Sequence, residues 1–217
     1  MNKESSDTEL SVSVSAGTVT LPGILGVPEA AMGVVLFVHG SGSGRLSPRN
    51  NTVARALQDA HLATLLVDLL TEQEEGDRRF VFNIELLAER LLACTEWLRE
   101  ARGTRALPVG YFGASTGAAG ALVAAANLGT AVRAVVSRGG RPDLAAHYLG
   151  RVQAATLLIV GGNDTPVIAL NERALAELRS EKRLVIVPGA THLFEEPGAL
   201  EEVTRLARDW FLRHLPD

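Results

Sequence analysis

Cysteine, aromatic residues, excess positive charge and long apolar runs are all scarce in this sequence. Cys94 is the only cysteine among 217 residues, which excludes an intramolecular disulfide and a cysteine-ligated zinc site. With 5% aromatic residues and a formal net charge of −4, the chain lacks the stacking platform and the basic face that nucleic-acid binding needs. No apolar run approaches the roughly 18 residues of a membrane span. We therefore expect neither a nucleic acid nor a membrane as a partner.

The N-terminal segment MNKESSDTEL is polar and lacks the apolar core of a signal peptide. We expect a cytoplasmic protein, which the single cysteine also suits. Residues 1–10 are expected to be disordered. The composition, 47% hydrophobic, can fill one sizeable core, so we expect a single domain over residues 1–217.

Short apolar runs alternate with helix-period segments along most of the chain. An antiparallel hairpin is predicted over residues 12–27. The later apolar runs have the near-continuous character of strands that are covered on both faces. They cover residues 34–38, 63–67, 107–112, 132–136, 156–160 and 184–187, and the helical segments cover 48–61, 80–101, 117–128, 166–179 and 197–214. This order predicts an α/β fold with a mostly parallel central sheet, an N-terminal hairpin and helices on both faces. The acidic stretch 72–77 is predicted to be a solvated loop.

The segment Gly113-Ala-Ser115-Thr-Gly117 places a serine between a predicted strand and a predicted helix. A chain that turns sharply there holds the serine in a strained conformation, and the small flanking residues let neighbouring backbone approach. The hydroxyl then stands at the carboxyl edge of the sheet, where open α/β sheets bind ligands. This context favours Ser115 as a catalytic nucleophile. The alternative is an ordinary helix cap.

A serine nucleophile needs a base, and His192 is the best placed of the histidines. It lies in a loop after the last predicted strand, at the same sheet edge as Ser115. His61 falls at the opposite edge, His147 in an irregular connection and His214 in the C-terminal helix. We therefore predict that His192 is the general base.

The acid that orients the histidine is expected between Ser115 and His192 in chain order. Asp164 follows the strand at 156–160 and would hold the imidazole tautomer and stabilise the imidazolium. Its alternative role is a helix N-cap before Pro166. Asp143 is a weaker candidate for the acid.

The glycine-rich segment 37–44 follows the first parallel strand and can present backbone amides to a substrate. We nominate the N–H groups of Ser41 and Thr116 as an oxyanion hole. The alternative, a phosphate-binding loop, lacks its Gly-Lys-Ser/Thr ending. His39 is expected to brace this loop.

Two further side chains are candidates for substrate contact. Arg138 is expected just past a strand end at the active edge, where it could bind a substrate carboxylate or form a structural salt bridge. Phe194, close to His192, could line the pocket or pack in the core. Arg45 and Arg49 could reach the cleft or be solvated.

Taken together, the motifs HGSGSG, SPRN, GASTG, VSRGGRPDL, VGGND and PGATHLFEEPGALEEV resemble the dienelactone hydrolase-like branch of the α/β-hydrolases. The resemblance covers nearly the whole chain after Val34, and it is strongest to the group often linked to phosphoribosyltransferases. Dienelactone hydrolases proper use a cysteine where Ser115 stands, so their lactone substrate does not carry over. The resemblance implies the α/β-hydrolase fold.

We expect a serine hydrolase that cleaves carboxylic esters of short acyl groups through Ser115, His192 and Asp164 and an acyl-enzyme intermediate. No cofactor and no metal are expected, and the partner is a small-molecule ester. A monomer or homodimer is expected. Two alternatives stay open: a thioesterase or acyltransferase with the same triad, and a non-catalytic binding protein on the same fold.

Overall fold

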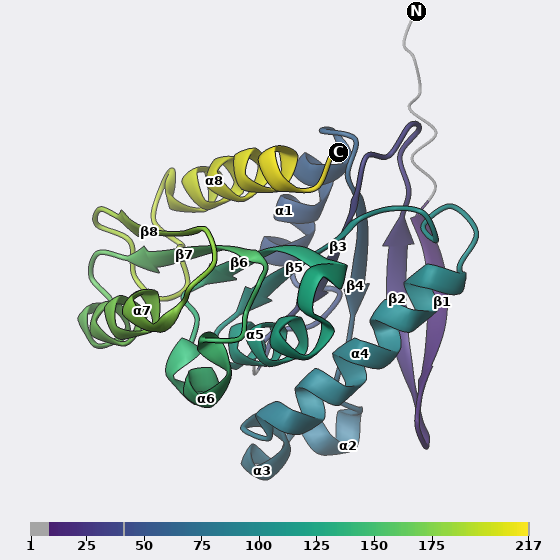
Figure 1. Cartoon of the computed structure of the whole chain (residues 1–217), viewed down its shortest axis with the longest axis horizontal. Helices are drawn as coiled ribbons and strands as arrows, with labels where there is room; N and C mark the ends of the chain where they lie inside the picture. Colours follow the sequence, from purple (N-terminus) through teal and green to yellow (C-terminus); the bar gives the residue numbers. More distant parts are fainter. Residues whose placement is uncertain (1–8, 41, 217) are drawn as a thin grey trace, which may run out of the picture.

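Eight strands of the computed structural model form one sheet, and the model describes residues 9–40 and 42–216 (Figure 1). The strands are β1 (Glu9–Ala16), β2 (Val19–Gly26), β3 (Val34–Val38), β4 (Ala63–Val67), β5 (Val109–Ala114), β6 (Val132–Arg138), β7 (Ala155–Gly161) and β8 (Lys182–Val187). Their order in the sheet is β1-β2-β4-β3-β5-β6-β7-β8. Strand β2 pairs antiparallel with both β1 and β4. All other neighbouring strands, from β4 through β3 and β5 to β8, pair in parallel. The predicted hairpin and parallel sheet are confirmed.

The hairpin starts earlier than the polar N-terminus suggests. The expectation of disorder over residues 1–10 is wrong for Glu9 and Leu10, which pair with Gly26 and Leu25 across the hairpin. The antiparallel register extends to them because β2 runs on to Gly26, which leaves ladder partners for both residues. The rest of that expectation, residues 1–8, lies outside the described residues.

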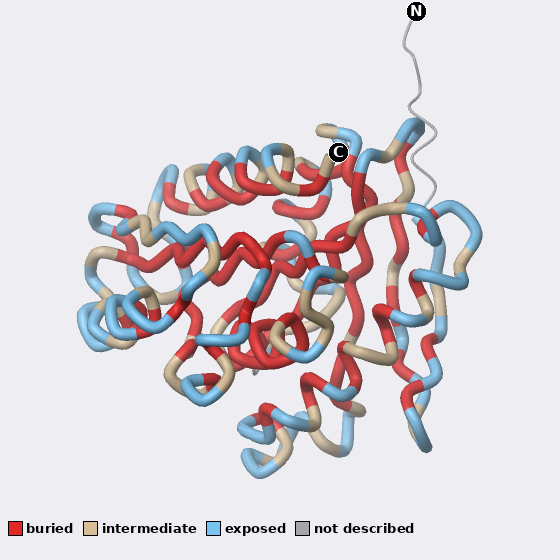
Figure 2. Tube along the Cα trace, viewed as in Figure 1, coloured by how far each residue is buried: buried red, intermediate tan, exposed pale blue. Residues whose placement is uncertain are grey.

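Helices cover both faces of the sheet. They are α1 (Pro48–Gln58), α2 (Glu72–Glu75), α3 (Arg78–Val81), α4 (Ile84–Glu100), α5 (Thr116–Leu128), α6 (Ala146–Leu149), α7 (Thr165–Glu177) and α8 (Ala199–His214). Figure 1 shows α1 and α8 on one face and α4, α5 and α6 on the other. Figure 2 shows the central strands and much of α5 buried. The near-continuous apolar runs are explained by this cover on both faces.

The prediction of a solvated loop over residues 72–77 is wrong, because this acidic stretch contains helix α2. Thr71 and Glu74 form a capping box at its start. The Arg90 guanidinium donates to both carboxylate oxygens of Glu74, at 2.6 and 2.7 Å, and to the carbonyl of Leu69 at 2.6 Å. Arg90 lowers the pKa of Glu74 to about 2. A long-range ion pair, which the local charge pattern could not reveal, holds this segment in place.

The single helix predicted over residues 80–101 is also divided in the structure. Helix α3 ends at Val81, and α4 begins at Ile84 after Asn83, whose side chain accepts from the backbone N–H of Leu86 at 3.1 Å. An asparagine in this position caps the new helix and ends the previous one. Segment 71–83 therefore contains two short helices, α2 and α3, and connects β4 to α4 at the carboxyl edge of the sheet.

None of the helices in the described part of the chain is long and apolar enough to cross a membrane. Across residues 9–40 and 42–216, no cluster of three or more His, Cys, Asp or Glu residues is placed to hold a metal ion. The loops that follow β3, β5, β6, β7 and β8 carry the candidate site residues.

Candidate active site

Ser115 sits in a strained turn between β5 and α5. Its φ is +51°, which is rare for a residue with a side chain. Its backbone N–H donates to the carbonyl of Arg138 at 3.3 Å, and this contact ties the turn to the end of β6. Ser115 occupies the N-cap position of α5, yet its hydroxyl caps no backbone N–H. The helix-cap alternative therefore fails to account for this serine.

Glycines surround Ser115 because the neighbouring backbone passes very close. A Cβ at Gly117 would overlap the carbonyl oxygen of Val38, and one at Gly113 would lie 2.5 Å from the Cα of Ala118. A Cβ at Gly40 would lie 2.8 Å from the Cβ of Ser115. The loop after β3 is thus packed directly against the serine.

Replacing Gly117 by alanine is expected to destabilise the protein by about 3 kcal/mol, although glycine to alanine normally stabilises a helix. The new methyl group has to displace the backbone of β3 and the loop that follows it. Urea unfolding at equilibrium measures the change. Gly76→Ala is the matched control, because its Cβ meets no atom within 4 Å. A loss below about 0.5 kcal/mol for Gly117→Ala would contradict this account of the turn.

Asp164 and His192 meet although 28 residues separate them. The Nδ1 atom of His192 lies 2.6 Å from Oδ2 of Asp164, a short hydrogen bond. The side chain of Asp164 is 13% exposed and that of His192 is 40% exposed. Asp164 stands at the N-cap position of α7, but its carboxylate caps no backbone N–H there. It is directed to the histidine instead.

The loop that carries His192 is attached to the loop that carries Asp164. Asn163 donates from its backbone to the carbonyl of Ala190 at 2.9 Å and from its side chain to the carbonyl of Gly189 at 2.8 Å. Thr191 is bound in turn by Glu196, whose carboxylate accepts from its hydroxyl at 2.6 Å. These contacts fix the backbone on both sides of the imidazole.

Gly139 links the histidine to the serine turn. A Cβ on Gly139 would lie 3.4 Å from both Cε1 and Nδ1 of His192, so the ring rests against this glycine. The residue before it, Arg138, accepts the N–H of Ser115. The imidazole and the serine therefore flank the same two-residue segment at the end of β6. The weaker acid candidate, Asp143, is bound instead by Arg141 at 2.7 and 2.8 Å.

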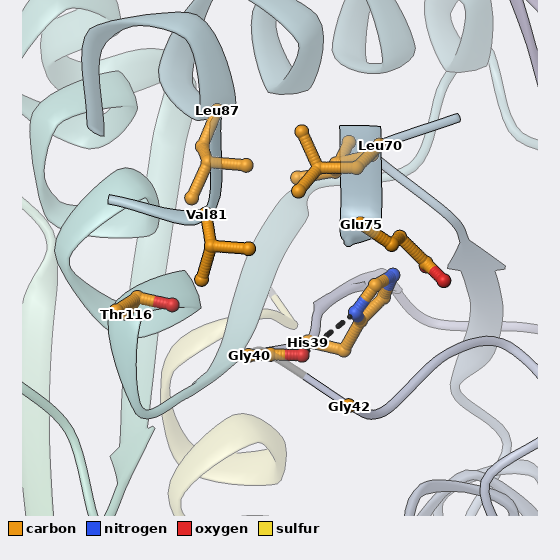
Figure 3. A pocket seen from close by; sticks show the side chains of 9 residues that line it. His39, Gly40, Gly42, Leu70, Glu75, Val81, Leu87 and Thr116 are labelled. Carbon is orange, nitrogen blue, oxygen red and sulfur yellow. Dashed lines mark hydrogen bonds between the residues drawn. The ribbon is translucent and has the colours of Figure 1, made fainter. Parts of the chain in front are cut away.

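One of the two predicted oxyanion donors, Thr116, directly follows Ser115 in the chain. Thr116 is the first residue of α5, where backbone N–H groups have no acceptor within the helix. The second donor, Ser41, lies outside the described residues. The imidazole of His39 donates from Nδ1 to the carbonyl of Gly40 at 3.1 Å (Figure 3). His39 thus contacts the backbone that flanks Ser115.

Asp68 holds the same loop and was missed by the sequence analysis. Its carboxylate accepts from the backbone N–H of Arg45 at 2.6 Å and from the Arg45 side chain, and it lies 3.5 Å from Nε2 of His39. Burial alone would raise the pKa of Asp68, but His39 and the donors of Arg45 hold it below its ordinary value. Its position directly after β4, at the active edge, is the signal that could have found it.

A small cavity opens beside Gly40 and Thr116 (Figure 3). Its other walls come from the end of β4, from segment 71–83 and from α4. The lining residues are His39, Gly40, Gly42, Leu69, Leu70, Glu75, Val81, Leu87 and Thr116. The cavity therefore extends from Gly40 and Thr116 toward α2 and α3, and away from His192.

The two candidate substrate contacts are both buried. Phe194 is 1% exposed and belongs to the core between the sheet and helices α1 and α8, so it packs rather than lines the cavity. Arg138 is 6% exposed, stacks on Phe112 at 5.9 Å and has no carboxylate partner in the described part of the chain. Burial and the charge of Arg49 lower its pKa to about 10. Its contact with a substrate stays a prediction.

Arg45 and Arg49 were predicted to reach the cleft or to be solvated. In the structure both form ion pairs. Arg45 pairs with Asp68, as described above, and Arg49 pairs with Glu195 at 2.7 Å. The Arg49–Glu195 pair joins the start of α1 to the loop of His192. Both arginines therefore connect active-edge loops to one another.

Comparison with known proteins places these features in a family. The model of the dienelactone hydrolase family matches residues 25–214. The crystal structure of a dienelactone hydrolase from Anabaena variabilis is 59% identical, covers 96% of this chain and 98% of its own, and superposes with a TM-score of 0.93. The esterase domain of a Rhodothermus marinus protein, at 20% identity, covers 95% of this chain and 99% of its own, with a TM-score of 0.77. At that identity the likeness extends to the fold alone.

Two curated relatives, from two strains of Mycobacterium tuberculosis, carry the name phosphoribosyl transferase. Each is 60% identical to this chain over 204 residues, which are 94% of this chain and 46% of the relative. The chain thus spans about half the length of these relatives, and their name describes the longer proteins. The family match and the Anabaena structure confirm the resemblance seen in the motifs: this chain belongs to the dienelactone hydrolase family and has the α/β-hydrolase fold.

Proposed function

We propose that this protein hydrolyses carboxylic esters, with Ser115 as nucleophile, His192 as general base and Asp164 as the acid that orients the histidine. The observation that carries the proposal is the 2.6 Å hydrogen bond between Asp164 and His192. It joins two residues from separate loops at the sheet edge where Ser115 occupies its strained turn. A carboxylate bound to Nδ1 leaves Nε2 free to accept a proton from a hydroxyl.

In the first step, the Oγ atom of Ser115 attacks the ester carbonyl carbon while Nε2 of His192 takes the hydroxyl proton. The carbonyl oxygen gains the negative charge, and the backbone N–H groups of Thr116 and Ser41 are the proposed donors to it. The carbon–oxygen bond to the alcohol then breaks. His192 returns the proton to the departing alkoxide, and an acyl group remains on Ser115.

In the second step, water attacks the acyl carbon and His192 takes one of its protons. The bond to Ser115 breaks, the serine oxygen is reprotonated by His192, and the carboxylic acid leaves. Protons and electron pairs balance over the two steps with no cofactor. Asp164 keeps its hydrogen bond to Nδ1 of His192 and stabilises the imidazolium that forms twice in each cycle.

A fluorophosphonate probe tests this assignment, because it forms a stable adduct with an activated serine. We expect stoichiometric labelling of the wild-type protein, with the added mass on the peptide that contains Ser115. His192→Ala is expected to suppress labelling strongly, whereas His147→Ala, a change at an exposed histidine, is expected to label normally. An unlabelled wild-type protein, or an adduct on another serine, would refute the assignment.

The acyl acceptor and the type of ester are measured separately. We expect water to be the acceptor, so that product acid forms in equal amount to released alcohol when other alcohols are absent. Matched oxygen and sulfur esters of the same acyl group compare esterase with thioesterase activity. A preference of more than about tenfold for the thioester would replace the proposed substrate class with thioesters.

A further inference from the structure

The cavity beside Gly40 and Thr116 lies on the opposite side of Ser115 from the histidine. In the sheet, β4 and β3 lie on one side of β5, and β6, β7 and β8 lie on the other. His192 and Asp164 follow β8 and β7, while Leu69 and Leu70 follow β4. The cavity and the base therefore approach the nucleophile from two sides.

This arrangement determines which part of an ester can enter the cavity. The carbon attacked by Ser115 carries an oxyanion, a leaving alcohol and an acyl substituent. In the proposed mechanism the alcohol oxygen faces His192, because His192 protonates it, and the oxyanion faces the Thr116 amide. The remaining direction, away from the histidine, is occupied by the acyl substituent.

The walls of the cavity are suited to hydrocarbon. Leu69, Leu70, Val81 and Leu87 are all buried, with exposures of 1, 7, 4 and 3%. Figure 3 shows Leu87 and Val81 one below the other on one side of the cavity, opposite Leu70. The volume open to a water-sized sphere is about 10 Å³, close to the minimum that one water molecule needs. Only a small apolar group can fill it.

Glu75 adds a charge preference at this cavity. It is exposed, and it is the carboxylate among the lining residues. The described residues that line the cavity include no lysine or arginine. An acyl group that ends in a carboxylate would therefore meet a like charge and find no cation.

We propose that this cavity is the acyl-binding pocket, and that Val81 and Leu87 limit it to short, uncharged acyl groups. The assignment rests on the proposed ester hydrolysis and names its substrate class. Val81 lies in α3, within segment 71–83. The ion pair between Glu74 of this segment and Arg90 of α4 holds the segment in place. Segment 71–83 therefore supplies part of the pocket wall. A change at Val81 alters the pocket without changing Ser115 or the loop of His192.

The test compares p-nitrophenyl acetate, butyrate, hexanoate and octanoate with the wild-type protein and with Val81→Ala and Val81→Leu. In the wild type, kcat/KM is expected to be highest for the acetate and to fall as the acyl chain lengthens. Each methylene that enters the pocket contributes about fourfold, equivalent to about 0.8 kcal/mol. Val81→Ala is expected to raise the butyrate-to-acetate ratio by about fourfold or more, and Val81→Leu is expected to lower it.

Val152→Ala is the matched control, because it removes the same atoms from a position that is 2% exposed and does not line the cavity. Its ratios are expected to equal those of the wild type even if its stability falls. A p-nitrophenyl succinate half-ester is expected to react more slowly than the butyrate, and Glu75→Gln is expected to narrow that difference. A second series, acetate esters of alcohols of increasing length, is expected to give unchanged ratios in both Val81 variants.

Unchanged acyl ratios in both Val81 variants, with acetate still turned over, would overturn the pocket assignment. A shift in the alcohol series instead of the acyl series would also overturn it, because the cavity would then hold the alcohol. Failure of the wild type to hydrolyse any ester or to react with a fluorophosphonate would overturn the proposed function, and with it this assignment.

Discussion

Ser115→Ala is expected to lower kcat for p-nitrophenyl acetate by at least about 10⁴-fold, with the fold retained. The alanine removes the only atom that forms the acyl-enzyme bond in the proposed mechanism. The loss of one half-buried hydroxyl that caps no helix should leave stability nearly unchanged. Initial-rate kinetics measure the first effect, and urea unfolding measures the second.

The double variant Ser115→Ala/His192→Ala makes this prediction more specific. If the two residues act as one unit, the double variant is expected to be about as slow as either single variant. Two independent roles would instead multiply the two losses. Ser15→Ala, on the exposed side of β1, is the control and is expected to retain full activity. Activity within about tenfold of wild type in Ser115→Ala would remove this serine from the reaction.

Asp164→Asn is expected to lower kcat by about 10³- to 10⁴-fold while leaving the fold intact. The amide is nearly the same size as the carboxylate, but it cannot stabilise the imidazolium of His192 and can favour the wrong tautomer. The 2.6 Å contact to Nδ1 is the interaction that changes. Steady-state kinetics on p-nitrophenyl acetate, with a melting curve for each variant, measure the effect.

Asp143→Asn is the matched control for this change. Asp143 lies between Ser115 and His192 in the chain, as the acid should, but its carboxylate is bound by Arg141. We expect less than threefold loss of kcat from this variant, because a partly exposed ion pair contributes roughly 0–1 kcal/mol. A large loss in Asp143→Asn together with near-normal activity in Asp164→Asn would exchange the two roles.

The structure of segment 71–83 could not be predicted from its local charge pattern. Its acidic run is typical of a solvated loop, yet Glu74 is bound by Arg90, 16 residues away. Because this partner depresses the pKa of Glu74 from 4.5 to about 2, the ion pair's contribution to stability is fully present above about pH 4.5. It is lost only as the pH falls toward about 2. Arg90 lies within the helical segment predicted over residues 80–101, and its contact with Glu74 is formed only in the folded structure.

The sequence by itself determined the α/β class, the run of strands and the position of the serine turn. Those features depend on local properties: apolar runs covered on both faces, and the small residues on either side of Ser115 that a strained turn requires. It also placed Asp164 and His192 in loops at one edge, because parallel strands present their carboxyl ends together.

Only the tertiary structure decided which side chains meet. It bound Asp164 to His192 and Asp143 to Arg141, buried Phe194 in the core, and left Arg138 without a carboxylate partner in the described part of the chain. It also brought Val81 and Leu87 next to Thr116 to form a cavity. These contacts depend on strand order and on the packing of elements far apart in the chain, and no local pattern of residues encodes those distances.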